Sequence, residues 1–194
     1  KAGKHVLGEK PLGRNACEAA ELTRIAAESG KVAAVGYSYR RVSALAQLRQ
    51  AVLDGRIGTP FFTRGHFFAD YALDASGPMV WRYDKEASGG GVVLDMATHV
   101  IDALEYILGP ISTVDSATFD TMIKERPNRD GSMAPVTNDD TSLINVRFAN
   151  GALGSIMSSR IAAGTTINLG FEIYGSNGHV TYDFTRMNEW TLYE

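Results

Sequence analysis

The chain has 194 residues, 44% of them hydrophobic and 21% charged, and a formal net charge of -3 at pH 7. This composition excludes a largely disordered chain, and the lack of a broad basic surface excludes nucleic acid as an expected partner. No apolar run reaches the ~18 residues of a membrane-spanning helix, and a single cysteine, Cys17, excludes an intrachain disulfide. We therefore expect a globular, cytoplasmic protein with no membrane contact.

The beginning of the chain has the pattern of a βαβ unit. Apolar residues at 5–7 predict a short strand, Asn15 can cap a helix that ends near Ser29 and Gly30, and residues 31–39 carry a second apolar strand. Two strands joined by one helix indicate a parallel pair. The chain opens like the end of a helix that runs into a strand, so we expect a fragment whose upstream part lies outside this sequence.

Further along, helical crossovers give way to hairpins. Helices are predicted from Ser43 to Asp54 and from Gly91 to Leu108. Strands are predicted at 61–68, 113–121, 142–148, 151–159, 167–174, 179–184 and 190–193. Hairpin turns at Asn150–Gly151 and Gly175–Gly178 predict a mainly antiparallel sheet. The polar stretch 124–137 is predicted to be a mobile loop.

A polar stripe runs along the otherwise apolar helix predicted at 91–108. At roughly 100° per residue, four polar side chains lie within about 40° of one another on it: Asp95, His99, Asp102 and Tyr106. Burying such a stripe is costly unless its members are hydrogen-bonded or face a pocket. An ordinary solvated face is the alternative. We predict that His99 can move a proton and that Asp95 anchors either His99 or a neighbouring hydroxyl.

Two other segments could carry chemistry. Lys10, in Gly8-Glu9-Lys10-Pro11, follows the first predicted strand, and ligands bind at the carboxyl ends of strands in open parallel sheets. The same tripeptide could instead be a solvated loop, and its proline bond can be cis or trans. Trp81 and Arg82 suit stacking on a sugar or nicotinamide ring, or, alternatively, a packed tryptophan beside a surface arginine. The histidines lack metal-ligand spacing, so no metal site is expected.

These segments together resemble the glucose–fructose oxidoreductase/inositol 2-dehydrogenase family (Gfo/Idh/MocA). The resemblance covers nearly the whole chain and rests on residues 2–12, 35–41, 81–82 and 89–102, and more weakly on 140–154. It implies an α/β fold: the end of a Rossmann-type parallel sheet followed by an α+β domain with a large, mainly antiparallel open sheet. Residues 1–36 would be the remnant of the dinucleotide-binding (Rossmann) domain and residues 37–194 the substrate-binding domain.

The resemblance also implies an activity. It indicates an NAD- or NADP-dependent oxidoreductase that transfers a hydride between nicotinamide and a secondary hydroxyl of a sugar or cyclitol. The expected catalytic residues are Lys10, Asp95 and His99, which also bind substrate together with Trp81. The expected cofactor-binding residues are Glu9, Lys10 and Arg82. The sequence contains no G-x-G-x-x-G loop opening a βα unit, so the pyrophosphate site should lie upstream.

The same residues are compatible with two other functions. An NAD-dependent glycoside hydrolase of the same family would oxidise its sugar only transiently. A non-catalytic dinucleotide-binding regulator would not need Lys10, Asp95 and His99 together. Because open-faced sheets often pair between subunits, we expect a homo-oligomer formed through the open sheet. The identity of the sugar and the choice between NAD and NADP are left open.

Overall fold

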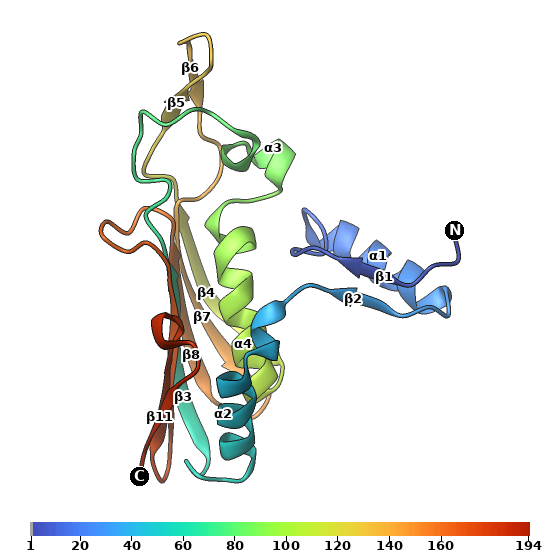
Figure 1. Ribbon diagram of the computed structural model, residues 1–194, viewed down its shortest axis with the longest axis vertical. Helices are drawn as coiled ribbons and strands as arrows, with labels where there is room; N and C mark the ends of the chain where they lie inside the picture. The colour runs from blue at the N-terminus through green and yellow to red at the C-terminus, as the bar shows by residue number, and fades with distance from the viewer. Residues whose placement is uncertain (1) are drawn as a thin grey trace.

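The computed structural model describes residues 2–194, so Lys1, the first residue of the predicted dinucleotide-binding remnant, lies outside the described residues. A large lobe of sheet and helices carries a small βαβ lobe that projects from its side (Figure 1). In the described part, the main sheet has the strand order β11-β10-β9-β3-β8-β7-β4. Its strands are β3 (Pro60–Phe68), β4 (Ile111–Asp120), β7 (Thr141–Phe148), β8 (Leu153–Ser159), β9 (Asn168–Gly175), β10 (His179–Asp183) and β11 (Trp190–Tyr193).

The pairing of these strands confirms the predicted mainly antiparallel sheet. Neighbours run antiparallel throughout except β3 and β8, which are parallel. Along β7, every second side chain is buried and the others are exposed, as expected of a sheet covered on one face. No helix in residues 2–194 is long and apolar enough to cross a bilayer.

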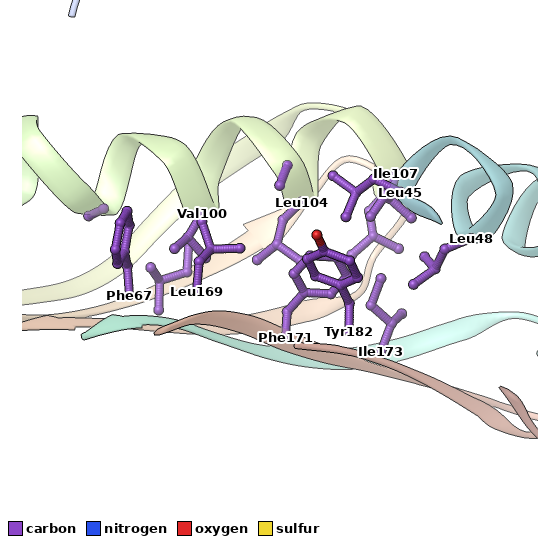
Figure 2. Close-up of a cluster of buried hydrophobic side chains, with 14 of the residues drawn as sticks. Leu45, Leu48, Phe67, Val100, Leu104, Ile107, Leu169, Phe171, Ile173 and Tyr182 are labelled. Carbon is purple, nitrogen blue, oxygen red and sulfur yellow. The ribbon is translucent and has the colours of Figure 1, made fainter. Parts of the chain in front are cut away.

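Helices α2 (Ser43–Leu53) and α4 (Thr98–Leu108) cover one face of the sheet (Figure 1). Figure 2 shows the resulting core, in which helix residues meet sheet residues: Leu45, Leu48, Val100, Leu104 and Ile107 against Phe67, Leu169, Phe171, Ile173 and Tyr182. Each such burial stabilises the fold by roughly 1.5–3 kcal/mol. Gly65 lets α4 approach β3, because a Cβ there would lie 2.6 Å from Cγ1 of Val100.

The small lobe confirms the predicted βαβ unit. Strands β1 (Val6–Gly8) and β2 (Ala33–Val35) are parallel, and α1 (Ala16–Glu28) connects them. Asn15 caps α1 by accepting a hydrogen bond from the backbone N–H of Glu18, as its position predicts. None of residues 16–28 is buried, and an apolar groove of about 700 Å³ runs along this lobe, lined by side chains that include Leu22, Ile25 and Val32.

The two lobes touch at a few points outside the connecting chain. The remaining helical elements are short: η1 (Ser38–Arg41), η2 (Trp81–Tyr83), α3 (Lys85–Ser88) and η4 (Phe184–Arg186). Gly89 ends α3 with a φ of 82°, and a Cβ on it would lie 2.2 Å from the carbonyl oxygen of Arg14. This glycine therefore allows close contact between the lobes.

The predicted loop at 124–137 is wrong. It forms a small antiparallel hairpin of β5 (Glu125–Pro127) and β6 (Met133–Pro135). The polar composition of this segment suggested an exposed loop, but the Arg126 side chain is buried, at only 1% exposed. The Arg126 guanidinium donates to the carbonyl oxygens of Ala72 and Asp74 and packs 4.1 Å from the centre of the Tyr83 ring. These contacts hold the hairpin against the segment that follows β3.

The helix predicted at 91–108 also needs correction. It begins with a π-helical turn, η3 (Val93–Ala97), before α4. The Asp139 carboxylate accepts hydrogen bonds from the backbone N–H groups of Gly91 and Val93 and so holds the start of this turn. Because a π turn widens the helix, the regular angular spacing used to align the polar stripe does not hold around Asp95.

Candidate active site

Two of the predicted site residues meet at the junction of the lobes. Lys10 follows β1, and its Nζ lies 2.7 Å from Oδ1 of Asp95 and 2.7 Å from the carbonyl oxygen of the same residue. The lysine side chain is 20% exposed and the aspartate side chain 39%. The Lys10–Pro11 peptide bond, which the residues alone left open, is cis. The structure thus joins residues that are 85 positions apart in the sequence.

A tyrosine that sequence reasoning missed contacts the other carboxylate oxygen. The hydroxyl of Tyr71 donates to Oδ2 of Asp95 over 3.1 Å. Burial raises the pKa of Asp95, but the hydrogen bond and charge of Lys10, helped by Tyr71 and Arg82, outweigh it and hold that pKa below its usual value. Asp95 is therefore an anionic acceptor with one donor on each oxygen.

His99 occupies an aromatic environment next to this pair. Its ring lies edge-on to Tyr39 and Tyr37, with centroids 4.8 and 5.8 Å away, and tilted to Phe67 at 5.9 Å. Burial, together with the charge of Lys10, lowers the pKa of His99 to about 4. The imidazole is consequently neutral at pH 7 and able to accept a proton.

The expected contact between Asp95 and His99 is not formed within residues 2–194. Asp95 binds Lys10 and Tyr71 instead, and Nδ1 of His99 is buried without a hydrogen-bond partner among the described residues. An orphaned buried nitrogen is costly, and such groups concentrate at functional sites. The predicted anchoring of His99 by Asp95 is thus corrected, because the lysine competes for the carboxylate.

The rest of the polar stripe has a structural role. Asp102 is held by Arg40 at 2.7 Å, and its side chain is only 12% exposed. The guanidinium groups of Arg40 and Arg49 lie 5.2 and 4.8 Å from the centre of the Tyr106 ring. Asp102 and Tyr106 therefore tie α4 to η1 and α2 rather than extending the site.

Trp81 and Arg82 lie on the exposed side of the site. Trp81 is 58% exposed, which excludes the packed alternative for its ring, and the Arg82 guanidinium lies 4.6 Å from the ring centre. The charge of Arg82 also lowers the pKa of Asp95. Glu9 is exposed beside Lys10, and its charge acts weakly on the pKa of His99. Five of the predicted site residues thus act on one another electrostatically, whereas Trp81 is linked to them through its contact with Arg82.

A buried polar network centred on Arg160 holds the segment that carries Trp81 and Arg82. The sequence pattern did not indicate this network. Arg160 is 2% exposed and binds Asp140 at 2.7 Å, Asn138 at 2.8 Å and the carbonyl oxygen of Arg82 at 3.3 Å. Its guanidinium lies 4.8 Å from the ring of Tyr83, on which Arg126 also packs. Across residues 2–194, no group of three His, Cys, Asp or Glu side chains could hold a metal ion.

An α+β sheet domain joined to a parallel βαβ unit, with a lysine–aspartate pair at the junction, defines a class of two-lobed α/β proteins. Comparison with known proteins specifies the family. The profile of the GFO/IDH/MocA C-terminal domain matches residues 45–181. The chain belongs to the Gfo/Idh/MocA family of oxidoreductases.

Individual relatives agree with this assignment. Levoglucosan dehydrogenase of Pseudarthrobacter phenanthrenivorans is 35% identical over 97% of this chain and 51% of its own length. The 1,5-anhydro-D-fructose reductase of Ensifer adhaerens is 32% identical over 92% of this chain and 49% of its own. A structure of levoglucosan dehydrogenase in complex with NADH and L-sorbose superimposes with a TM-score of 0.95, at 36% identity, over 98% of this chain and 51% of that one. The chain spans about half the length of the relatives it matches.

Proposed function

We propose that this chain is part of an NAD- or NADP-dependent dehydrogenase that oxidises a secondary hydroxyl of a sugar or cyclitol. One observation carries the proposal: a lysine ammonium and an aspartate carboxylate, 2.7 Å apart at the end of a parallel strand, lie beside an imidazole that is neutral at pH 7. The relatives named for levoglucosan and 1,5-anhydro-D-fructose support a sugar as the substrate class.

In this proposal, each side chain carries out one step. Neutral His99 accepts the proton of the reacting hydroxyl. Lys10 donates a hydrogen bond to the same oxygen and stabilises the negative charge that develops there. Asp95 holds the ammonium of Lys10 in place. The nicotinamide, when bound, supplies the acceptor for the hydride that leaves the alcohol carbon.

The residues at the strand ends fit the nicotinamide end of the cofactor. Glycines lie at the carboxyl ends of both strands: β1 ends at Gly8 and Gly36 follows β2, and a Cβ on Gly36 would lie 3.3 Å from the carbonyl oxygen of Gly8. Such bare strand ends are where ligands approach the backbone of a parallel sheet. Glu9, Lys10 and Arg82 would contact this end. The orphaned Nδ1 of His99 is consistent with a site that a ligand completes.

We further propose that residues 1–36 belong to a dinucleotide-binding domain and residues 37–194 form the substrate-binding domain. The support is the contrast in burial. The large lobe has its own core, whereas the small lobe exposes apolar side chains such as Val6, Leu7 and Val32. A parallel sheet normally has both faces covered.

We also propose that the protein is a cytoplasmic homo-oligomer, and the open face of the main sheet supports the oligomer. Phe62, Tyr174, His179 and Tyr193 stack side by side across four strands, with centroid distances of 4.6, 4.7 and 4.2 Å. Exposed aromatic and aliphatic groups on one sheet face favour pairing with another copy. Analytical ultracentrifugation that finds only monomers at micromolar concentration would reject this part of the proposal.

The function is tested with the full-length protein. Levoglucosan, other sugars and inositols are each offered with NAD and with NADP, and the absorbance of the reduced nicotinamide is followed. Substrate-dependent reduction supports the dehydrogenase. Release of sugar from a glycoside without net reduction would indicate the hydrolase, and dinucleotide binding without turnover of any substrate would indicate the regulator.

A further inference from the structure

Tyr71 is the residue of this site that the family resemblance and the sequence pattern did not assign. It lies just after β3, between Ala69 and Ala72, which are 4% and 0% exposed. The backbone on both sides is fixed: the N–H of Ala69 donates to Ser159 and the N–H of Ala72 donates to Arg160. Tyr71 is itself 50% exposed. A large aromatic residue held rigidly but left exposed is more typical of a binding surface than of a core.

The frame behind Tyr71 contains both buried arginines. Arg126 donates to the carbonyl oxygen of Ala72. Arg160 donates to Asp140 and packs against the ring of Tyr83. Burying two guanidinium groups costs free energy unless they are hydrogen-bonded. Here their hydrogen bonds fix the position of the segment that carries Tyr71. The hydroxyl of Tyr71 is thereby directed at Asp95.

The bond between Tyr71 and Asp95 is suited to exchange with a ligand. Its length of 3.1 Å is at the long end for an O–H···O bond, whereas the Lys10 bond to the same carboxylate is 2.7 Å. Burial and the nearby Asp95 raise the pKa of Tyr71, so the phenol stays protonated at neutral pH. An alcohol entering between the two residues could donate to Oδ2 of Asp95 and accept from the Tyr71 hydroxyl.

We propose that Tyr71 is a substrate-binding residue that, together with Asp95, receives a hydroxyl on the carbon next to the one oxidised, and so selects for vicinal diols. This inference rests on the proposed function. Lys10 is bound to Oδ1 and is assigned to the reacting oxygen, which leaves Oδ2 and the phenol for a neighbouring oxygen. A site built to hydrogen-bond a hydroxyl discriminates against the analogue that lacks it.

The test compares Tyr71→Phe with the unaltered full-length protein. Its substrates are the best one from the panel and the monodeoxy analogues at the carbons next to the oxidised position. Tyr106→Phe is the matched control, since it also removes one phenol hydroxyl but lies in α4, among the structural contacts of Arg40 and Arg49. We expect Tyr71→Phe to raise KM for the parent roughly 3–10-fold with little change in kcat. It should also lose the preference for the parent over one deoxy analogue, while Tyr106→Phe keeps both the KM and the preference of the unaltered protein.

A second readout does not depend on turnover. The carboxyl carbon of Asp95, followed by ¹³C NMR, should titrate at a higher pH in Tyr71→Phe, because a hydrogen bond that stabilises the anion is lost. Turnover with an unchanged preference in Tyr71→Phe overturns this inference alone. An equal loss for parent and deoxy substrates, together with a lower unfolding midpoint, also overturns it in favour of a structural role. Failure of the unaltered protein to oxidise any sugar or cyclitol overturns the proposed function, and this inference with it.

Discussion

Asp95 and His99 occupy the first half of a polar stripe whose second half is Asp102 and Tyr106. Both halves lie on one continuous helical segment and both carry an acid beside a ring. In the first half, the acid binds a lysine from the other lobe and the imidazole keeps an unpartnered nitrogen. In the second half, Arg40 forms an ion pair with Asp102, and the Arg49 guanidinium packs on the Tyr106 ring.

The difference between the halves lies in their partners. Arg40 and Arg49 come from elements that pack permanently on α4, and their planar guanidinium groups satisfy the polar groups they meet. Lys10 comes from a strand-end loop and leaves His99 unpaired. A polar stripe on a helix therefore indicates function only where its partners leave hydrogen-bonding capacity unused.

The largest expected effect separates the halves by activity. His99→Ala in the full-length protein should lower kcat by roughly 10²–10⁴-fold, because the acceptor of the hydroxyl proton is removed. Asp102→Asn, the matched change in the other half, should leave kcat nearly unchanged. Steady-state kinetics on the best substrate measures both. Similar losses in the two variants would abolish the distinction drawn here.

The second effect is on stability in acid. The pKa of His99 falls from 6.5 to about 4 on folding. Between these pH values the unfolded chain therefore binds a proton at His99 that the folded chain does not bind. The free energy of unfolding should therefore decrease by about 3 kcal/mol as the pH falls from above 6.5 to about 4. Asp95 adds a further loss only at lower pH, since its pKa is depressed from 3.8.

Urea unfolding at several pH values measures this slope. His99→Gln serves as the comparison, since an amide does not titrate and should flatten the decrease between pH 6.5 and 4. An equally steep decrease in His99→Gln would mean that other groups cause it. An imidazole NMR titration with a midpoint near pH 6.5 would contradict the buried, neutral histidine directly.

The smallest effect concerns the second half of the stripe. Arg40→Met should lower the free energy of unfolding by about 0.5–1 kcal/mol, because the Arg40 side chain is 41% exposed and solvent screens its pair with Asp102. The KM of the substrate should stay the same. A marked rise in KM would place Asp102 in the binding site, and the comparison between the halves would then need revision.

Much of this architecture was predictable, for identifiable reasons. The βαβ unit and the antiparallel strands follow from apolar periodicity and turn residues, and the meeting of Lys10 with Asp95 follows from a resemblance over several segments. The π turn at 93–97 was not predictable, because it depends on Asp139, a residue more than forty positions away. The hairpin at 125–135 was missed because a buried arginine reads as a loop residue.

Tyr71 was missed for a related reason. It stands alone among polar and small residues after a strand, and no local spacing distinguishes it from a loop tyrosine. Its role emerges only from the hydrogen bond to Asp95 and from the frame formed by Arg126 and Arg160. Side chains positioned by long-range contacts lie beyond the reach of patterns that repeat over a few residues.

The Lys10–Asp95 pair joins the two lobes, which residues 36–38, the Arg14–Glu86 hydrogen bond and the close contact at Gly89 also connect. The proposed reacting centre therefore exists only where the two lobes meet, and the ion pair is one of the contacts between them. A side chain at position 89 would collide with the backbone of Arg14. We expect it to separate the lobes there and to move Lys10 away from the Asp95 carboxylate. If the proposed mechanism holds, the relative placement of the lobes sets the position of Lys10 and so affects the reaction rate.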